Sequence, residues 1–571
     1  MSRLRWLTLL SVLALVIAAC GTPAATTTTA APTTTATTAA PPTTTDGTDF
    51  EGKRVAAVDC GYGGKISSIE ATGQHEVTFT LCSPVPAFQQ IVAFNVFGVQ
   101  PEEHLEATGG APLDNPVGTG PFVLEAWNRG DSIVYQQNPD YWGDLPAYQT
   151  LVYRWGTESA ARLLELQSGN DADYITNVAP SDIATVEGDS SLVLLPNRAP
   201  NVMYLGMSTG YFDANGTEVI HEPFDQVEVR QAFAMGLNRQ QLVDNFFAPG
   251  SEVASHFVPC SVPNACTGDP WYDFDADAAQ ELLADAGASD LEVTLYYRDV
   301  VRPYLPEAGP VAQEIAQDLS ENLGITVTVQ VVESGEFIEA ATIGAYSLYL
   351  LGWTADYPHI TNFLDFHFGE ANPQFGATYA DIYEPLVEAS ALADVAATEP
   401  LYEAANNAIR TNIPMVPVSH AASNDAALAS LEGGVSPVFG APQFQSMNPG
   451  KDTLVFVQNA EPISLYCADE TDGESLAACQ PVVEGLLGYD NDGQVVPKLA
   501  TECVPNEDST VWTCTLREGV TFHDGSTFDA NDVVTSWEAG IDAASPLHVG
   551  NSGVFEYYTY LWTQLMNALA G

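Results

Sequence analysis

Two charged residues follow strands that a parallel sheet would bring to one edge. Arg302 stands in the segment RDVVRPY (298–304), and Asp356 stands in the segment GWTADYP (352–358). A guanidinium group can bind a carboxylate through two hydrogen bonds, and a carboxylate can accept the protons of an ammonium group. If both side chains face one hollow, they can hold the two ends of a short zwitterionic chain.

The charge balance makes a cation at this edge unusual. The 571 residues include 17 lysines and arginines against 74 aspartates and glutamates, which gives a formal charge of −57. Such a field repels nucleic acid and anionic membrane surfaces, so we expect neither as a partner. The structural alternative is that Arg302 and Asp356 form an ion pair with each other or with neighbouring residues.

The elements between residues 291 and 353 must position these two groups. The spacing predicts strands over 291–298, 325–332 and 346–353, and helices over 310–322 and 336–343. In the first helix, Val311, Ile315 and Leu319 share one face, and Gly324 ends it. This alternation indicates parallel strands with right-handed crossovers. Ligands of such sheets bind outside the carboxyl ends of the strands.

The first 49 residues carry export signals. Arg3 and Arg5 precede an apolar run, and small residues lead up to Cys20. This pattern is typical of an export signal, and the cysteine resembles that of the bacterial lipobox, which becomes acylated. We predict a lipoprotein signal peptide over 1–20, a Thr/Ala/Pro-rich disordered linker over 21–49, and a lipid anchor on Cys20. An ordinary signal peptide is the alternative.

The remaining cysteines are expected to form disulfides, since an exported protein can oxidise them. Pairing each with its nearest neighbour predicts Cys60–Cys82, Cys260–Cys266, Cys467–Cys479 and Cys503–Cys514. The last pair follows from TECVPNED and STVWTCTL, which predict two strands of one hairpin with the cysteines opposed. Other connectivities stay open, because sequence alone does not fix the pairing.

Catalytic motifs are incomplete in this sequence. His75–Glu76 begins like a zinc-protease helix, but Phe79 stands where the second histidine belongs. The sequence contains no GxSxG, its nine histidines are scattered, and GYGG (61–64) precedes no clear helix. We predict that the chain is not an enzyme and uses no cofactor or metal.

A family resemblance rests on longer strings. Signatures of the extracellular solute-binding proteins of family 5 resemble GTGPF (118–122), RGDSIVYQQNPDYWG (129–143), EVRQAFAMGLNRQQLVD (228–244) and REGVTFHDGSTFDANDVVTSWE (517–538). The chain is similar to the peptide-binding branch of that family, the periplasmic dipeptide- and oligopeptide-binding proteins. The resemblance covers residues 50–571.

The order of the strings departs from the family. Two segments resemble the family's amino-terminal portion but come last here, DTLVFVQNAEPISLY (452–466) and VVEGLLGYDNDGQVVPKLA (482–500). They follow a segment, 413–434, that resembles the family's usual ending. We infer a circular permutation with new termini near Phe50 and Gly571, because family termini lie close together on the surface. A misassembled gene is the alternative.

The resemblance implies an α/β fold of the periplasmic-binding-protein kind (type II, cluster C), with two lobes around a cleft and an extra subdomain. We expect the large lobe and subdomain at 50–205 and 425–571, and the second α/β lobe at 206–424. Strands near 202–208 and 415–420 are expected to form the hinge. In the family, the lobes close over the ligand.

The resemblance also implies the ligand contacts. Dipeptide-binding members hold the ligand carboxylate with an Arg in an RPY segment and the α-amino group with an Asp in a GWT-x-D segment. The corresponding residues here are Arg302 and Asp356. Tyr304 and Trp353 are expected to line the pocket, and Thr471 and Gly473 of the other lobe to meet the peptide backbone, on a looser alignment.

Two departures leave the side-chain preference of the site open. The family's S-L-D-P reads Ser464–Leu465–Tyr466–Cys467 here, and His359–Ile360 replaces an Asp-Pro after Pro358. Alternative cargoes are therefore longer peptides, nickel chelates and small sugars. A non-transport surface sensor or scaffold is a further alternative.

The expected function is that of a lipid-anchored substrate-binding protein of an ABC importer, which captures di- or oligopeptides between two lobes. Its expected partners are the peptide and the permease subunits of the importer. We expect a monomer at the outer face of the cytoplasmic membrane.

Overall fold

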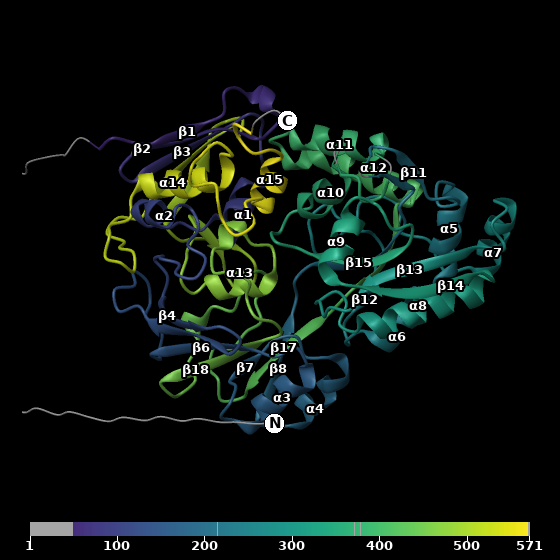
Figure 1. Cartoon of the computed structure of the whole chain (residues 1–571), viewed down its shortest axis with the longest axis horizontal. Coiled ribbons are helices and arrows are strands. Elements are labelled where there is room, and N and C mark those ends of the chain that lie inside the picture. Colours follow the sequence, from purple (N-terminus) through teal and green to yellow (C-terminus); the bar gives the residue numbers. More distant parts are fainter. Residues whose placement is uncertain (1–49, 214, 370–371, 377, 569–571) are drawn as a thin grey trace, which may run out of the picture. The chain divides into compact units, whose positions relative to one another are not determined.

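Three large sheets carry the fold in the computed structural model, which describes residues 50–213, 215–369, 372–376 and 378–568 (Figure 1). Residues Phe50–Gly571 form one compact unit. The predicted signal peptide (1–20), the linker (21–49) and Cys20 lie outside the described residues. Within the described part, no helix is both long enough and apolar enough to cross a membrane.

The six-stranded sheet contains the elements predicted between 291 and 353. Its order is β12 (Glu252–Val253), β16 (Met415–His420), β9 (Asn201–Gly206), β15 (Tyr349–Thr354), β13 (Glu292–Arg298) and β14 (Thr326–Val332). β13 pairs in parallel with both β14 and β15, as predicted, and β9 pairs antiparallel with β15. The carboxyl ends of β13 and β15 therefore meet at one edge.

Helix α8 (Ala308–Leu323) confirms the amphipathic pattern of its segment. Val311, Ile315 and Leu319 are buried, and Gly324 ends the helix in a left-handed conformation. The helix begins two residues before the predicted start at Pro310, which places this proline in the first turn. Proline is tolerated there because its missing N–H would have no helical partner. The next helix, α9, spans Ser334–Thr342.

The seven-stranded sheet combines distant parts of the sequence. Its order is β4 (Phe122–Asn128), β5 (Ser132–Gln137), β6 (Thr150–Trp155), β18 (Thr453–Gln458), β7 (Tyr174–Ile175), β17 (Ser423–Leu428) and β8 (Leu192–Asn197). β18 pairs in parallel with β6 on one side and with β7 on the other. Without β18 the sheet would separate into two parts.

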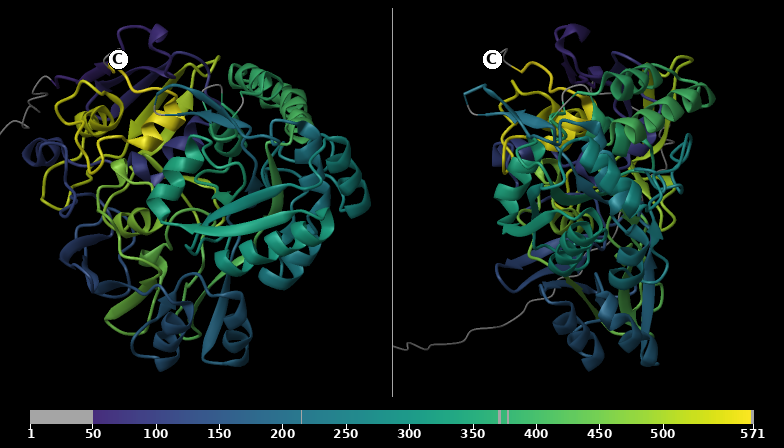
Figure 2. Two further views of the ribbon diagram at one scale, coloured as in Figure 1. Left: turned by 45° about the vertical axis from the view of Figure 1, so that its right-hand side comes forward. Right: turned by 90° about the vertical axis from the view of Figure 1, so that its right-hand side faces the viewer.

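The five-stranded sheet also joins the two ends of the described chain. Its order is β1 (Arg54–Ala56), β2 (Ile66–Gly73), β3 (Glu76–Leu81), β22 (Val511–Leu516) and β21 (Ala500–Pro505). Helix α14 (Ala530–Ile541) packs against β2, and its buried Trp537 meets Phe79 of β3 with ring centroids 5.0 Å apart. Figure 2 shows the yellow C-terminal helices against the purple strands in both views.

The GTGPF motif brings two distant segments into backbone contact. The amide of Gly120 donates to the carbonyl of Val482 at 2.9 Å, and a side chain at Gly118 or Gly120 would overlap the Val482 backbone. Between them, Thr119 Oγ1 donates to Oε2 of the buried Glu484 at 3.0 Å. The glycines are thus needed for close approach of two chains, a known role of this residue.

Two short connections link the six- and seven-stranded sheets. β8 leads into β9 through residues 198–200, and β16 leads into β17 through residues 421–422. The Asn201 side chain bridges them, since its Nδ2 donates to the Ala421 carbonyl at 2.8 Å and its Oδ1 accepts from the Ala421 amide at 2.9 Å. The expected hinge strands, 202–208 and 415–420, fall largely on β9 and β16, and their hinge role stays a prediction.

The remaining elements complete the layers. Two small hairpins are β10 (Gly210–Phe212) with β11 (Glu218–Ile220), and β19 (Leu487–Tyr489) with β20 (Val495–Pro497). The other helices are α1 (Phe88–Val92), α2 (Glu102–Thr108), α3 (Ser159–Ser168), α4 (Ile183–Gly188), α5 (Val227–Gly236), α6 (Arg239–Phe246), α7 (Ala276–Asp285), α10 (Thr361–Phe368), α11 (Ala380–Ser390), α12 (Val395–Asn412), α13 (Gly473–Cys479) and α15 (Glu556–Trp562).

The four predicted cysteine pairs lie together in the structure. The Cα–Cα distances are 5.5 Å for Cys60–Cys82, 5.2 Å for Cys260–Cys266, 6.2 Å for Cys467–Cys479 and 4.0 Å for Cys503–Cys514. The last pair stands at opposed positions of the antiparallel hairpin β21–β22.

Disulfide mapping tests this connectivity. Digestion without reduction is expected to yield four linked peptide pairs with nearest-neighbour connectivity, which mass spectrometry identifies. Replacing both Cys503 and Cys514 by serine is expected to lower the free energy of unfolding by about 2–3 kcal/mol, because the short loop is no longer constrained in the unfolded chain. A mixed pairing, or free thiols in the oxidised protein, would contradict the assignment.

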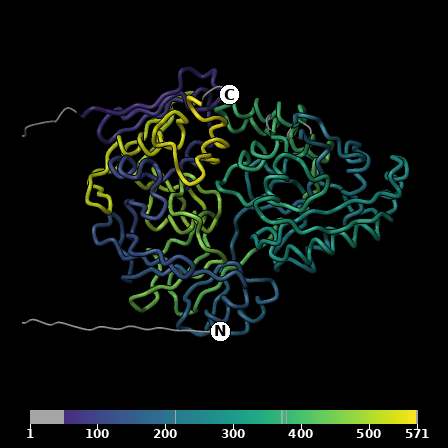
Figure 3. The backbone as a smooth tube through the Cα atoms, viewed as in Figure 1, coloured from purple at the N-terminus to yellow at the C-terminus, as the bar shows by residue number. Residues whose placement is uncertain are grey.

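A chain rearranged to the family's order tests the inferred permutation. The described ends are close, since Asn567 Nδ2 donates to the Ala56 carbonyl at 3.3 Å, and Figure 3 shows the yellow end beside the purple strands. We expect a chain opened at the exposed Gly450, with its old ends joined by a short linker, to keep its circular dichroism spectrum. Its stability should change by no more than about 1–2 kcal/mol, since closing such a loop costs little.

The matched control is a chain opened within β18, between Val455 and Phe456, which should not fold because the cut lies inside the seven-stranded sheet. Equal behaviour of the two rearranged chains, or misfolding of the first alone, would count against the permutation.

Candidate functional site

A cavity of about 210 Å³ lies between elements from opposite parts of the chain. One side is formed by α1, α15 and Lys65, and the other by the end of β15, the loop 355–360, α10 and α12. The volume is smaller than the roughly 300–1,000 Å³ of a typical drug-sized ligand site. The cavity therefore suits a small molecule or one end of a longer one.

Asp356 presents its carboxylate to this cavity and is held there from both sides. Tyr557 of α15 donates its hydroxyl to Oδ1 at 2.9 Å, and Asn362 of α10 donates Nδ2 to Oδ2 at 3.1 Å. The backbone amide of Asp356 donates to Oδ1 of the same Asn362 at 3.0 Å. Burial raises the pKa of Asp356 from 3.8 to about 6, although both side-chain hydrogen bonds oppose this change.

Trp353 forms an aromatic wall of the cavity next to Asp356. Its ring stacks on Phe366 with centroids 4.0 Å apart, and its indole N–H donates to Asn362 Oδ1 at 2.9 Å. Asn362 thus fixes both the tryptophan and the aspartate. Tyr357, Tyr402 and Tyr560 continue the aromatic lining.

The position of Tyr557 depends on the buried Asp469, which lies between β18 and α13. Asp469 accepts hydrogen bonds from the backbone amides of Gly553 and Phe555, both at 2.8 Å. These bonds hold the loop that enters α15, in which Phe555 has the unusual positive φ of 48°. The Asp469 carboxylate therefore determines where α15 begins and where Tyr557 points.

The same side of the cavity carries a second carboxylate, that of Asp365 on α10. Asp365 lies 4.0 Å from Lys65 Nζ, and burial raises its pKa to about 6, against the effect of the lysine charge. Burial and the Lys65 charge lower the pKa of His359 to about 4, so this ring is neutral at pH 7. The cavity is therefore an apolar, aromatic space in which carboxylates outnumber cations.

Arg302 does not line this cavity. Its guanidinium Nη1 lies 3.7 Å from Glu474 Oε1 of α13, so the structure contains the alternative in which Arg302 forms an ion pair with another residue.

The other predicted contacts have different surroundings. Tyr304 is only 5% exposed and packs under Gly352, where any side chain would overlap its ring, so it belongs to the core rather than to the cavity wall. Thr471 and Gly473 are exposed and flank Asp472 at the start of α13, close in sequence to the Arg302 partner Glu474. The ligand contacts predicted for these residues stay predictions.

Two polar residues of the site were missed in the sequence analysis. Asn362 stands six positions after Asp356 in the same segment, so a search of that segment for amide donors would have found it. Tyr557 lies 201 positions away and carries no local signal. It reaches Asp356 only through the packing of α15.

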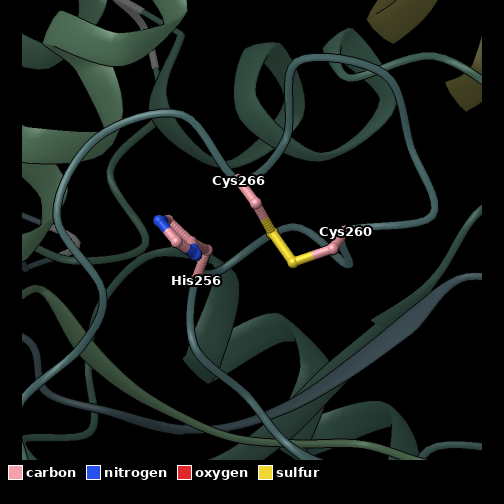
Figure 4. A group of neighbouring side chains, drawn as sticks. All are labelled: His256, Cys260 and Cys266. Carbon is pink, nitrogen blue, oxygen red and sulfur yellow. A yellow bond between two sulfur atoms is a disulfide. The ribbon is translucent and has the colours of Figure 1, made fainter.

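A separate group of possible metal ligands, His256, Cys260 and Cys266, lies elsewhere in the described chain (Figure 4). Their ligand atoms lie within 4.8 Å of one another, but the two sulfurs are joined in a disulfide. The thiolate is the form of cysteine that binds metals. In this oxidation state the group offers only the His256 imidazole.

The family profile of the bacterial extracellular solute-binding proteins, family 5 Middle, matches residues 25–375 and 494–553. The chain belongs to this family. Its members are named for solute binding, and the prediction that the chain is not an enzyme is confirmed on this ground. The predicted α/β fold of the periplasmic binding proteins is confirmed as well.

Characterised relatives of this family 5 protein carry peptide-related names. The Di/tripeptide-binding protein 3 of Pseudomonas aeruginosa (strain UCBPP-PA14) is 30% identical over 376 residues, which are 63% of this chain and 68% of the relative. The Dipeptide-binding protein of Escherichia coli (strain K12) is 27% identical over 394 residues, which are 67% and 71% of the two chains.

Solved structures show the same fold. The periplasmic binding protein DppA of Helicobacter pylori, in complex with the peptide STSA, has a TM-score of 0.59 at 23% identity, over 68% of this chain and 75% of that chain. HbpA2 of Haemophilus parasuis has a TM-score of 0.56 at 26% identity, over 67% and 75% of the two chains. The family match and the relatives together show that the family 5 protein is a substrate-binding protein.

Removing the Tyr557 hydroxyl tests the geometry around Asp356. Because this O–H donates to the ionised carboxylate, Tyr557→Phe should raise the pKa of Asp356 above about 6 by roughly one unit, the equivalent of about 1.4 kcal/mol. The titration can be followed by NMR of ¹³C-labelled aspartate, with the Asp356→Asn variant assigning the signal.

Tyr560→Phe is the matched control, since Tyr560 lies on the same helix and lines the same cavity. It should leave the Asp356 titration unchanged. A shift in the control equal to that in Tyr557→Phe would refute the specific contact.

Proposed function

We propose that the chain captures di- or oligopeptides for an ABC importer and binds the peptide's α-ammonium group at Asp356. One observation supports this proposal above the others. A carboxylate with a pKa of about 6, still ionised at pH 7, stands in an aromatic cavity and has accepted only two side-chain hydrogen bonds. A carboxylate can accept about four, so it has room for an ammonium donor.

The relatives support the class of cargo. The names of the Pseudomonas aeruginosa and Escherichia coli relatives refer to dipeptides and tripeptides. A more distant relative, the Heme-binding protein A of Haemophilus influenzae, is 24% identical, so the family name alone does not decide the cargo. The two aspartates of the cavity belong to a chain with a strongly negative net charge. Their electrostatic field favours binding of a cationic amine over binding of an anionic ligand.

The proposal depends on Asp356 and not on Arg302. Arg302 lies near Glu474 instead of lining the cavity, and its predicted contact with the ligand carboxylate stays untested. The lipid anchor on Cys20 and the linker over 21–49 belong to the same proposal. They would keep the binding unit near the permease subunits of the importer.

Calorimetry with trialanine and N-acetyl-trialanine tests the α-ammonium contact. The probes differ in the charge at the amino end, so the wild-type chain should bind trialanine and bind the acetylated form at least about 30-fold more weakly. Asp356→Asn should bind trialanine more weakly than the wild type by a similar factor, and it should bind the two probes with equal affinity. Native mass spectrometry of the freshly purified protein would identify retained cargo.

Asp365→Asn is the matched control, because it removes a carboxylate of the same cavity with a similarly raised pKa. It should weaken trialanine binding by less than about fivefold, because it changes only the general electrostatic field in the cavity and removes no direct contact with the ammonium group. Equal losses in the two variants, or undiminished binding by Asp356→Asn, would refute the role of Asp356.

A further inference from the structure

The cavity that holds Asp356 also contains a side-chain amide whose acceptor has no partner. Gln90 of α1 lines this cavity, and its Oε1 is enclosed and accepts no hydrogen bond from the described part of the chain. The other lining residues of the same stretch are apolar, namely Pro84, Val85, Pro86, Ala87 and Ile91. An enclosed acceptor without a donor is destabilising, so this oxygen calls for a donor that enters the cavity.

The backbone around Gln90 is held in place by neighbouring elements. The Tyr489 hydroxyl of β19 donates to the backbone carbonyl of Gln90. The side chain of the preceding residue, Gln89, donates its Nε2 to the carbonyl of Cys503 in β21 at 2.7 Å. These bonds fix α1 without using the Gln90 side chain, so its amide is positioned in the cavity before a ligand binds.

Gln90 and Asp356 are linked by a short series of contacts across the cavity. Tyr557 donates to Asp356 Oδ1 at 2.9 Å, and the Tyr557 ring meets the edge of Phe94 with centroids 4.8 Å apart. Phe94 follows Gln90 by four positions, and its amide donates to the Ile91 carbonyl at 3.0 Å, so the helical turn continues to it. Residues four apart in such a turn share one face. Gln90 and Asp356 therefore approach one cavity from its two sides.

A peptide bound by its ammonium group at Asp356 would bring donors toward this oxygen. An extended chain advances by about 3.3–3.6 Å per residue, so the first two peptide N–H groups lie within about 7 Å of the ammonium group. A peptide group carries one N–H donor and one carbonyl acceptor, and a glutamine amide has both kinds of group. An amide in an otherwise apolar stretch of wall thus suits a peptide group better than a hydrocarbon.

We propose that Gln90 Oε1 accepts a hydrogen bond from a backbone N–H of the bound peptide, which makes Gln90 a specificity-determining residue for the peptide bond. The proposal rests on peptide capture at Asp356 and adds a second contact from the opposite side of the cavity. It explains how the site would prefer a peptide over an amine that has an ammonium group and no amide. Because the contact uses the ligand backbone, it imposes no preference for particular ligand side chains.

Calorimetry with trialanine and two ester analogues, alanyl-lactyl-alanine and alanyl-alanyl-lactate, is the test. Each analogue replaces one peptide N–H by an ester oxygen and keeps both charged ends. The wild-type chain should bind at least one analogue about tenfold more weakly than trialanine, because the ester oxygen brings no donor to Oε1.

Two variants of Gln90 connect this preference to the side chain. Gln90→Met has a similar length and no amide, so it should bind trialanine about tenfold more weakly and bind that analogue with nearly the same affinity as trialanine. Gln90→Glu keeps an acceptor oxygen at this position and should keep the preference for trialanine. A loss of packing alone would not separate the two variants in this way.

Gln89→Met is the matched control, since Gln89 lies on the same helix and is bonded to Cys503 instead of lining the cavity. It should keep the tenfold preference. The proposal is overturned if the wild type binds both analogues as tightly as trialanine, or if Gln90→Met keeps the preference, as it would where a water molecule satisfies Oε1. Weakened trialanine binding by Asp356→Asn would then show that peptide capture survives. If trialanine does not bind the wild type, or binds Asp356→Asn equally well, peptide capture fails and this proposal fails with it.

Discussion

The architecture depends on the return of the chain after residue 450 into sheets built by residues 50–200. The buried Glu484 shows how strict this constraint is. Its carboxylate accepts from Thr119 at 3.0 Å, Tyr141 at 3.0 Å and Trp142 at 2.7 Å, and Lys498 Nζ lies 3.5 Å away. A buried carboxylate without these donors would cost several kcal/mol. The two segments therefore complete each other or leave an unsatisfied charge in the core.

The candidate site inherits this constraint. Asp356 and Asn362 belong to the part of the chain that forms the six-stranded sheet, whereas Tyr557 and Glu474 belong to the returning segment. Each cluster therefore joins the two parts of the chain, by a hydrogen bond at Asp356 and by an ion pair at Arg302. A change in the packing of the segment after residue 450 would therefore alter the contacts at Asp356 and at Arg302 together.

Local patterns were sufficient to predict the parallel strands from 292 to 354, the hairpin of Cys503 and Cys514, and the place of Asp356 just past the end of a strand. These features follow from periodicity over a few residues and from the rule for strand ends. The burial of Tyr304 could not be predicted, because it depends on the missing side chain at Gly352 on a neighbouring strand. The contacts of Tyr557 and Glu474 could not be predicted either, because only tertiary packing brings these residues to their partners.

The state of Asp356 shows why burial and binding are linked here. Burial in an apolar cavity destabilises its negative charge, and the raised pKa measures that cost, while two donors offset only part of it. An ammonium group would supply the missing compensation inside the same low-dielectric space, where the attraction is stronger than in water. Because one donor comes from α15 and the other from α10, the full compensation exists only while both sides enclose the carboxylate. If Asp356 binds an ammonium group as proposed, binding would favour the arrangement in which both α10 and α15 contact the carboxylate.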